Sequence, residues 1–404
     1  MEALNIILLI IEYVIFIYFG FASLYVFIFA LAGQFYKDPS FKNSGEFKKI
    51  AVLIPGYKED QVIVNVAKSA LQQDYPSDRY DVVVIADSFQ ESTLDKLKAL
   101  PIKLIEVSFE KSTKSKALNK AMAQLGDAYD VALILDADNI MESDFVSKMD
   151  EAFANGCTVV QGHRVAKNVN TSFAILDAIS EEVNNHIFRK GHRKLGLSAS
   201  LIGSAMAFDY AFFKDVMANV NAVGGFDKEL EFKLIKDKII LEYINDAYVY
   251  DEKIQRSKDF QNQRRRWLSA QFVYLRRYFV PGLKGFLLQG NVDFIDKVYQ
   301  MVTPPRILLL GVVTILTGLY ALLQFVFPEF VTNIDPTYWY VAFGLTVLAF
   351  FLSIPRKFYN ADTLKAAITL PKAFFLMFLM LFKLKGANKK FIHTQHGTLN
   401  DQKS

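Results

Sequence analysis

Two short stretches carry side chains whose types and spacing suit chemistry on a phosphorylated ligand. The segment from Gln263 to Trp267 places three guanidinium groups beside an indole. Such a cluster can hold a diphosphate and stack on the flat face of a sugar. Upstream, Asp136 and Asp138 offer two carboxylates that can hold a divalent cation on the same diphosphate. Together the two stretches indicate an enzyme that handles a nucleotide-sugar.

The acidic pair follows the apolar run from Val131 to Leu135, which is typical of a buried strand. Side chains two residues apart at a strand end face the same side, so Asp136 and Asp138 can reach one ligand. Hard oxygen ligands suit Mg²⁺ or Mn²⁺. The structural alternative is a polar turn in which Asp138 caps a following helix. We predict a metal site formed by Asp138 and Asp136.

Two other stretches have both a functional and a structural interpretation. Lys111, Lys114 and Lys116 lie at an expected helix start, where lysines oppose the helix dipole. A phosphate-bearing ligand would compensate for that, and a solvated loop is the alternative. The small residues from Gly203 to Ala207 would allow a sugar to approach the backbone closely. A tight turn at a strand end explains them equally well.

Three acidic residues lie close together in the sequence, namely Asp227, Glu229 and Glu231. A carboxylate near an acceptor hydroxyl can act as a general base. The alternative is the start of a helix with solvated charges. The sequence alone does not separate these two interpretations.

Composition indicates a membrane protein with a soluble middle. The chain has 404 residues, of which 52% are apolar, and the apolar excess lies at the two ends. A net charge of +4 gives no argument for nucleic-acid binding. Cys157 is the only cysteine, which excludes an intramolecular disulfide and fits a reducing compartment. We expect it to be a small core residue rather than a nucleophile.

Three segments are apolar enough to predict membrane spans, namely Tyr13–Gly33, Ile307–Phe327 and Trp339–Ile354. Lysines follow the first span at positions 37, 42, 48 and 49, and the positive-inside rule places that side in the cytoplasm. The segment Leu364–Leu384 is interrupted by charges and a proline. An interfacial helix is the favoured interpretation of it, with a fourth span as the alternative.

The soluble middle alternates strand-like and helix-like patterns, which predicts a mostly parallel α/β sheet. The expected strands are Ile50–Ile54, Val82–Ala86, Leu104–Val107, Val131–Leu135 and Thr158–Gln161. The expected helices are Asp60–Gln73 and Ser115–Leu125. Ligands of open sheets bind beyond the carboxyl ends of the strands. Those ends carry Pro55, Tyr57, Asp87 and Asp136, so we expect a nucleotide there.

These stretches, in this order, resemble membrane-bound glycosyltransferase family 2. That family includes cellulose, chitin and hyaluronan synthases and the non-processive ceramide glucosyltransferase. The resemblance covers roughly residues 49–268 and the tail. It implies a GT-A-like fold and nucleotide-sugar contacts from Pro55, Tyr57, Glu59, Asp87, Lys116, Asp136, Gln263, Arg266 and Trp267. It also implies acceptor contacts from Gly203, Ser204 and Trp267, and a tail segment, Phe391–Gly397, that closes over nucleotide.

One position departs from the family pattern. The family has Glu-Asp before an acidic helix, and its Asp is the catalytic base. The matching pair here is Lys228-Glu229. Glu229 is then the first candidate for the base, and Asp227 is the second.

The resemblance implies an inverting, metal-dependent hexosyltransferase that uses Mg²⁺ or Mn²⁺. We expect it to move a hexose or N-acetylhexosamine from a UDP-sugar to a growing β-linked polysaccharide. The alternative is a single addition to a lipid acceptor. A non-catalytic membrane scaffold is a third interpretation, supported only by the altered acidic pair. Because three spans are few for enclosing a polar channel, a homodimer or an export partner would help secretion of a polymer.

The expected organisation has five parts. They are an anchor at 1–36, a GT-A domain at 37–280, an interfacial helix region at 281–306, two membrane helices at 307–354, and an interfacial helix with a tail at 355–404. We expect a plasma or inner membrane protein whose catalytic domain is cytoplasmic.

Overall fold

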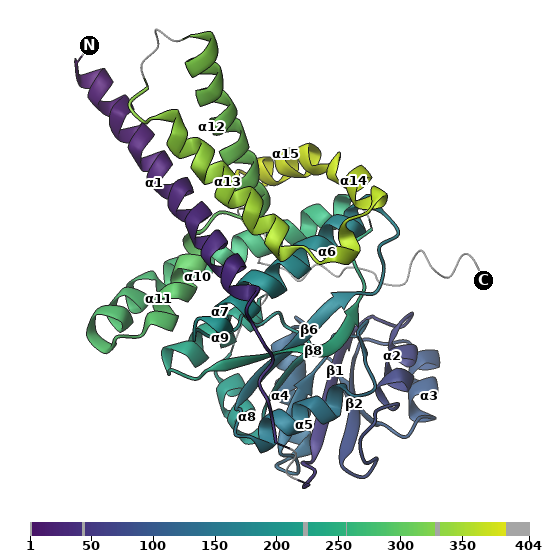
Figure 1. Ribbon diagram of the computed structural model, residues 1–404. Helices are drawn as coiled ribbons and strands as arrows, with labels where there is room; N and C mark the ends of the chain where they lie inside the picture. The colour runs from purple at the N-terminus through teal and green to yellow at the C-terminus, as the bar shows by residue number, and fades with distance from the viewer. Residues whose placement is uncertain (1, 43–44, 221–224, 256, 328–331, 385–404) are drawn as a thin grey trace.

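The computed structural model describes residues 2–42, 45–220, 225–255, 257–327 and 332–384. Its α/β part lies below a group of upright helices (Figure 1). The strands are β1 (Ile50–Tyr57), β2 (Tyr80–Asp87), β3 (Lys103–Val107), β4 (Val131–Ile134), β5 (Ile140–Met141), β6 (Val159–Ala166), β7 (Met206–Asp209) and β8 (Leu241–Asp251). The tail segment Phe391–Gly397 lies outside the described residues.

The α/β part contains α2 (Ile63–Ala70), α3 (Glu91–Lys98), α4 (Lys114–Leu125), α5 (Phe145–Ala154), α6 (Ser172–Asn185), α7 (His192–Lys194), α8 (Tyr210–Ala218), α9 (Phe226–Lys236), α10 (Ser257–Gln289) and α11 (Val292–Val302). The remaining helices are α1 (Glu2–Gly33), α12 (Arg306–Val326), α13 (Pro336–Ser353), α14 (Ala361–Ala367) and α15 (Leu370–Leu381). A π-helical turn, η1 (His186–Gly191), follows α6, and a 3₁₀ turn, η2 (Arg356–Phe358), follows α13.

The described strands form one sheet in the order β3-β2-β1-β4-β7-β6-β8-β5. The pairs β3-β2, β2-β1, β1-β4 and β6-β8 are parallel. The pairs β4-β7, β6-β7 and β5-β8 are antiparallel. The mostly parallel sheet expected from the sequence is confirmed. Parallel pairing brings the ends of β1 and β2 together, so Tyr57 lies opposite Asp87.

The sheet has an apolar cluster on each face, which explains why its central strands are apolar at every position. Alternate residues of β1 point to opposite sides. Leu53 joins a cluster that α4, α8, α9, α10 and α11 complete. Val52 and Ile54 join the other cluster, which α2 and α5 cover. Phe294 and Val298 of α11 belong to the first cluster, so the expected interfacial region contributes to the core.

Three helices are long and apolar enough to cross a membrane: α1 from Asn5, α12 and α13. They rise side by side above the sheet (Figure 1). Helices α12 and α13 coincide with their predicted spans within three residues, whereas α1 ends at Gly33 as predicted but its apolar stretch begins at Asn5, eight residues before Tyr13. Helices α14 and α15 meet at 41° and also pass as one broken segment, so the choice between an interfacial helix and a fourth span stays a prediction.

Helix α6 lies between the sheet and the upright helices (Figure 1). Thr171 caps its start by accepting a hydrogen bond from the amide of Ala174 at 3.1 Å. Its apolar residues Ala178 and Val183 pack in one cluster with Ala22 and Val26 of α1. Its polar residues point to the other side, toward the strand ends. Helix α6 therefore connects the membrane helices to the site described next.

Candidate active site

Three carboxylates meet beyond the ends of β4 and β8. Oxygens of Asp136, Asp138 and Asp251 lie within 4.8 Å of one another, and Asp138 and Asp251 are buried. Asp136 is partly exposed, so a ligand can reach the cluster from that side. Three hard oxygen donors, two of them held rigidly, fit Mg²⁺ or Mn²⁺. The predicted metal ligands Asp136 and Asp138 are brought together, and Asp251 joins them.

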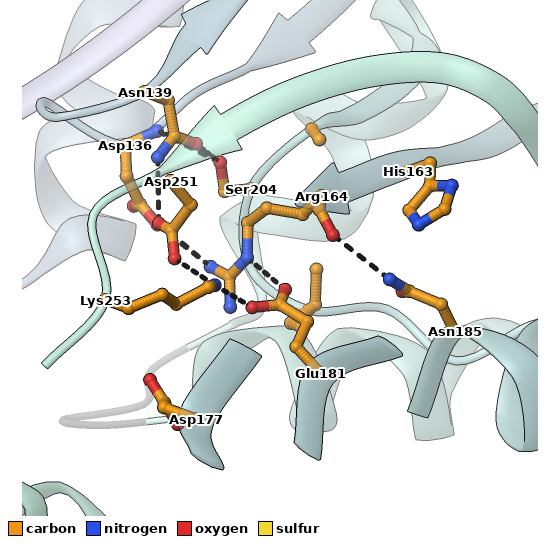
Figure 2. Close-up of polar contacts among 12 residues, drawn as sticks. Asp136, Asn139, His163, Arg164, Asp177, Glu181, Asn185, Ser204, Asp251 and Lys253 are labelled. Carbon is orange, nitrogen blue, oxygen red and sulfur yellow. Dashed lines mark hydrogen bonds and ion pairs between the residues drawn. The ribbon is translucent and has the colours of Figure 1, made fainter. Parts of the chain in front are cut away.

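Two cations, Arg164 and Lys253, lie beside Asp136 and Asp251 (Figure 2). A guanidinium nitrogen of Arg164 lies 3.7 Å from Asp136 and 3.6 Å from Asp251. The Lys253 ammonium donates to Asp251 at 2.7 Å. Burial alone would raise the pKa of Asp251, but Arg164 and Lys253 outweigh it and hold this pKa well below its usual range. Asp251 is therefore ionised at neutral pH, and its carboxylate can serve as a metal ligand.

Helix α6 holds these cations in place from the membrane side. Glu181 accepts from Arg164 at 2.5 Å and also pairs with Lys253. Asn185 donates to the backbone carbonyl of Arg164 at 3.0 Å (Figure 2). Glu182 accepts from His163 at 3.0 Å. Burial opposes ionisation of Glu182, but this bond and Lys357 prevail and hold its pKa at about 2.

The loop after β4 is fixed by buried polar side chains. The amide of Asp136 donates to the Ser204 hydroxyl at 3.2 Å, and that hydroxyl bonds to Asn139. Asn139 in turn donates to Asp251 at 3.0 Å. Ser204 is fully buried, so it shapes the acidic loop rather than presenting its hydroxyl to solvent.

Lys114 links Asp136 to the backbone of Gly203, and we call the region around these three residues the acidic corner of the site. Lys114 pairs with Asp136 and donates to the Gly203 carbonyl at 2.7 Å. Gly203 has φ +84°, which glycine adopts without strain. A Cβ on Gly203 would lie 3.7 Å from the carboxyl carbon of Asp227, so Asp227 faces the same corner.

A cavity of about 1180 Å³ opens from this corner and continues between the membrane helices. At the sheet end its lining includes Asp136, Lys114 and Asp227. At the other end its lining is apolar and comes from α12, α13 and α15, for example Leu310, Phe351 and Phe374. One continuous space thus joins the acidic cluster to the helices that are apolar enough to lie in a membrane.

The arginine and tryptophan segment lies on α10 and borders this cavity. Arg266 and Trp267 line it, and the Trp267 indole is 45% exposed. Arg264 is buried, pairs with Asp177 of α6 at 2.6 Å, and lies over the indole at 4.4 Å from the ring centre. This contact holds the Trp267 ring, which also lines the cavity and remains partly exposed.

The two candidate bases occupy different surroundings. Asp227 lines the cavity, and burial raises the pKa of its carboxyl. Glu229 is not among the lining residues, and its oxygens lie 3.2 Å from Arg277 and 3.6 Å from Lys233. Because a general base must reach the proton it removes, this arrangement favours Asp227 over the sequence's first candidate.

The other predicted nucleotide contacts lie outside this cavity. Pro55, Tyr57 and Glu59 lie at or just beyond the end of β1, and buried Asp87 ends β2. Lys116 is exposed and donates to the Lys111 carbonyl at 3.1 Å, so Lys114, two residues earlier, is the lysine that reaches the acidic corner. Gln263 does not line the cavity.

Asp251, Arg164 and Lys253 were missed from the sequence. Asp251 did leave a signal, because it ends a run in which alternate residues such as Ala247 and Val249 are apolar and buried. Asp251 therefore stands at the end of a buried strand, as Asp87 and Asp136 do, and could have been picked out in the same way. Arg164 and Lys253 left none, since their role depends on partners distant in sequence.

Known proteins provide an independent comparison. The chain is 25% identical to the probable glycosyltransferase YdaM of Bacillus subtilis over 249 residues, which is 58% of each chain. It is 27% identical to the dolichol-phosphate mannosyltransferase of Pyrococcus furiosus over 123 residues, 30% of this chain and 34% of that one. The chain thus spans well under two thirds of the length of either relative.

The fold is similar to that of the mannosyltransferase PcManGT from Pyrobaculum calidifontis, solved in complex with GDP-Man and Mn²⁺. The TM-score is 0.52 at 15% identity, over 89% of this chain and 97% of that one. This likeness shows a GT-A-like fold. Residues 48–270, more than half of the chain, match the model of the family described as glycosyltransferase like family 2, and the protein therefore belongs to that family.

Proposed function

We propose that this protein is a membrane-embedded, metal-dependent glycosyltransferase that adds one sugar from a nucleotide-sugar to a lipid acceptor. The cavity carries this proposal, because it joins the acidic cluster to apolar walls on α12, α13 and α15. Its volume of about 1180 Å³ exceeds the range of about 300–1,000 Å³ for ordinary ligand pockets. It therefore offers room for a sugar at one end and for part of a lipid at the other.

The residues at the sheet end suit an inverting displacement. Asp227 accepts the proton of an acceptor hydroxyl, which then attacks the anomeric carbon as the bond to the diphosphate breaks. Arg266 and Lys114 stabilise the negative charge that develops on the departing diphosphate. Asp136, Asp138 and Asp251 would hold Mg²⁺ or Mn²⁺, which supplies additional charge neutralisation there. Trp267 offers its exposed face to a sugar ring.

The donor that we propose is a UDP-linked hexose or N-acetylhexosamine, as the sequence predicts. PcManGT was solved with GDP-Man, so a guanosine donor belongs in any test. Extension of a polysaccharide remains the second candidate function. Its support is the Trp267 indole, whose 45% exposure gives a stacking face that a sugar chain could also use.

The test is a transfer assay with purified protein in liposomes made from total lipids of the native membrane. Radiolabelled UDP-glucose, UDP-N-acetylglucosamine and GDP-mannose are supplied singly with Mn²⁺. We expect label from one donor to enter an organic-extractable product in which each acceptor lipid has gained one sugar. A labelled product of high molecular weight would support the polysaccharide interpretation instead. No release of nucleoside diphosphate with any donor would contradict both.

A further inference from the structure

The cavity has a cationic section between its acidic corner and its apolar end. Arg189 of η1 and Arg306 of α12 both line it, and neither belongs to a motif identified from the sequence. Arg189 is 2% exposed and donates to the Ser200 carbonyl at 2.9 Å and to Asn185 at 2.6 Å. Both partners are neutral. Burial lowers the pKa of Arg189 and outweighs the opposing charges of Glu181 and Glu231, neither of which pairs with it directly.

Arg306 is the first residue of α12, where its charge opposes the helix dipole. It donates to the Ser180 carbonyl over 3.4 Å and lies 5.3 Å from the centre of the Phe188 ring. The charged groups that act on it most are Arg264 and Arg189, which have the same sign. Within the described residues, neither Arg306 nor Arg189 forms an ion pair with a carboxylate.

Arg264, which also lines the cavity, shows how the protein neutralises a buried arginine with one of its own carboxylates. Its guanidinium pairs with Asp177 at 2.6 Å. Buried charges are normally paired, because leaving water costs several kcal/mol per ion. Two cavity-lining guanidinium groups with only neutral partners, held near a third, therefore indicate an anion that binds between them.

We propose that Arg189 and Arg306 bind the phosphate or diphosphate group of a lipid, and that this anionic lipid is the acceptor. The inference rests on the proposed function, since it names the acceptor class of the same site. Forked guanidinium groups match phosphate oxygens. Beyond Arg306, the cavity continues along Leu310, Thr314 and Ile315 of the same helix, where a hydrocarbon tail fits.

The presence of Asp227 in the cavity bears on which group of the acceptor attacks the sugar. A phosphate monoester is already largely ionised at neutral pH and needs no base to attack. A cavity that also contains a carboxylate of raised pKa suits an acceptor whose attacking group is a hydroxyl. The acceptor is then a lipid whose phosphate or diphosphate carries a saccharide, with that saccharide reaching Asp227.

The first experiment measures binding of three probes to the full-length protein in detergent micelles. Farnesyl diphosphate, farnesol and inorganic pyrophosphate are titrated separately, in EDTA so that no cation at the carboxylates recruits the probe. We expect farnesyl diphosphate to bind about 10- to 100-fold more tightly than farnesol, as two charge-assisted contacts imply. Equal binding of farnesol, or no binding of farnesyl diphosphate, would overturn the proposal. Equal binding of pyrophosphate would assign the site to a free anion rather than to a lipid.

The second experiment uses Arg306→Gln with Lys365→Gln as the matched control, since Lys365 is an exposed cation that does not line the cavity. Arg306→Gln should weaken farnesyl diphosphate binding at least about 10-fold, whereas Lys365→Gln should leave it unchanged. An unchanged affinity in Arg306→Gln, with an unchanged unfolding temperature, refutes the role of Arg306. Arg189→Gln is secondary, because its buried hydrogen bonds also support the fold.

Transfer assays separate this inference from the proposed function. If neutral glycolipids receive sugar as readily as lipid phosphates that carry a saccharide, the proposed function stands and the anionic acceptor is wrong. If no lipid of either kind receives sugar, the proposed function itself fails.

Discussion

At the scale of single residues, the placement of two carboxylates on α9 decides which can act as a base. Asp227 and Glu229 are two positions apart, and residues at that spacing do not share a helix face. Asp227 therefore reaches the cavity while Glu229 turns toward Arg277 of α10. Asp227 is therefore the carboxylate that we propose as the base in place of Glu229.

Replacing Asp227 with Asn should lower turnover by about 10²- to 10⁴-fold, the range that a general base contributes. Donor binding, measured by calorimetry, should persist. The raised pKa of Asp227 means that activity is lost as pH falls through a value above that of an ordinary aspartate. Glu229→Gln is the control, and we expect it to turn over at nearly the normal rate. The reverse result, an inactive Glu229→Gln with an active Asp227→Asn, would restore the first sequence prediction.

Asp251 is the second residue whose replacement is informative. Changing it to Asn removes one of three charges from the acidic cluster, so Mn²⁺ affinity should fall at least about 10-fold. The measurement is the Mn²⁺ dependence of nucleoside diphosphate release. Asp246→Asn is a matched control, because Asp246 lies on the same strand but its carboxylate is exposed and pairs with Lys148. Equal Mn²⁺ dependence in the two variants would exclude Asp251 as a ligand.

At the scale of elements, the junction between α1 and η1 depends on close backbone packing. A Cβ on Gly191 would lie 2.2 Å from the Phe29 carbonyl oxygen of α1, a distance that atoms do not tolerate. Next to it, the His186 ring approaches Gly33, and its Nε2 bonds to the Ala30 carbonyl at 2.8 Å. The end of the anchor helix is thereby seated directly on the segment that follows α6.

Gly191→Ala should therefore separate α1 from η1 and destabilise the protein by about 1–3 kcal/mol, the usual cost of overpacking. The measurement is the thermal unfolding midpoint in detergent. Gly318→Ala on α12 is the control, since a Cβ there meets no atom within 4 Å. The interpretation would be wrong if both variants unfolded at the temperature of the unmodified protein.

The elements predicted well from sequence are those formed by local apolar runs. Strands β1, β2 and β4 and helices α12 and α13 lie within a few residues of their predicted positions, and α1 ends where it was predicted to end, because continuous apolar runs leave a continuous signal. The sequence did not distinguish the short strand β7 from a turn. Its extended conformation depends on pairing with β4 and β6, which lie far away in the sequence. β8 brings Asp251 to Asp136 across 115 residues, a proximity that no local pattern encodes.

At the scale of the whole molecule, orientation in the membrane stays a proposal. The lysines after α1 favour a cytoplasmic catalytic domain. With three spans the C-terminus is also cytoplasmic, whereas a span formed by α14 and α15 would place it outside. The bend of 41° between these helices is compatible with a broken span and with an interfacial segment, so it does not choose between them.

Ser404→Cys, made in a Cys157→Ser background, should resist a membrane-impermeant maleimide in intact cells and react after lysis. Pro328→Cys in the predicted external loop should react in intact cells and so serves as the positive control. The Cys157→Ser change leaves the introduced cysteine as the single thiol. Cys157 itself should react slowly with the maleimide, because burial raises the pKa of its thiol to about 11. Labelling of Ser404→Cys from outside would contradict the three-span arrangement.

The cavity walled by α12, α13 and α15 has a kinetic consequence if its occupant is a lipid. Substrate and product would enter and leave sideways, through the bilayer rather than through water. The quantity that sets the rate would then be the mole fraction of acceptor in the plane of the bilayer. Diluting the acceptor with inert phospholipid would slow the reaction at constant bulk concentration, whereas adding more vesicles of unchanged composition would not.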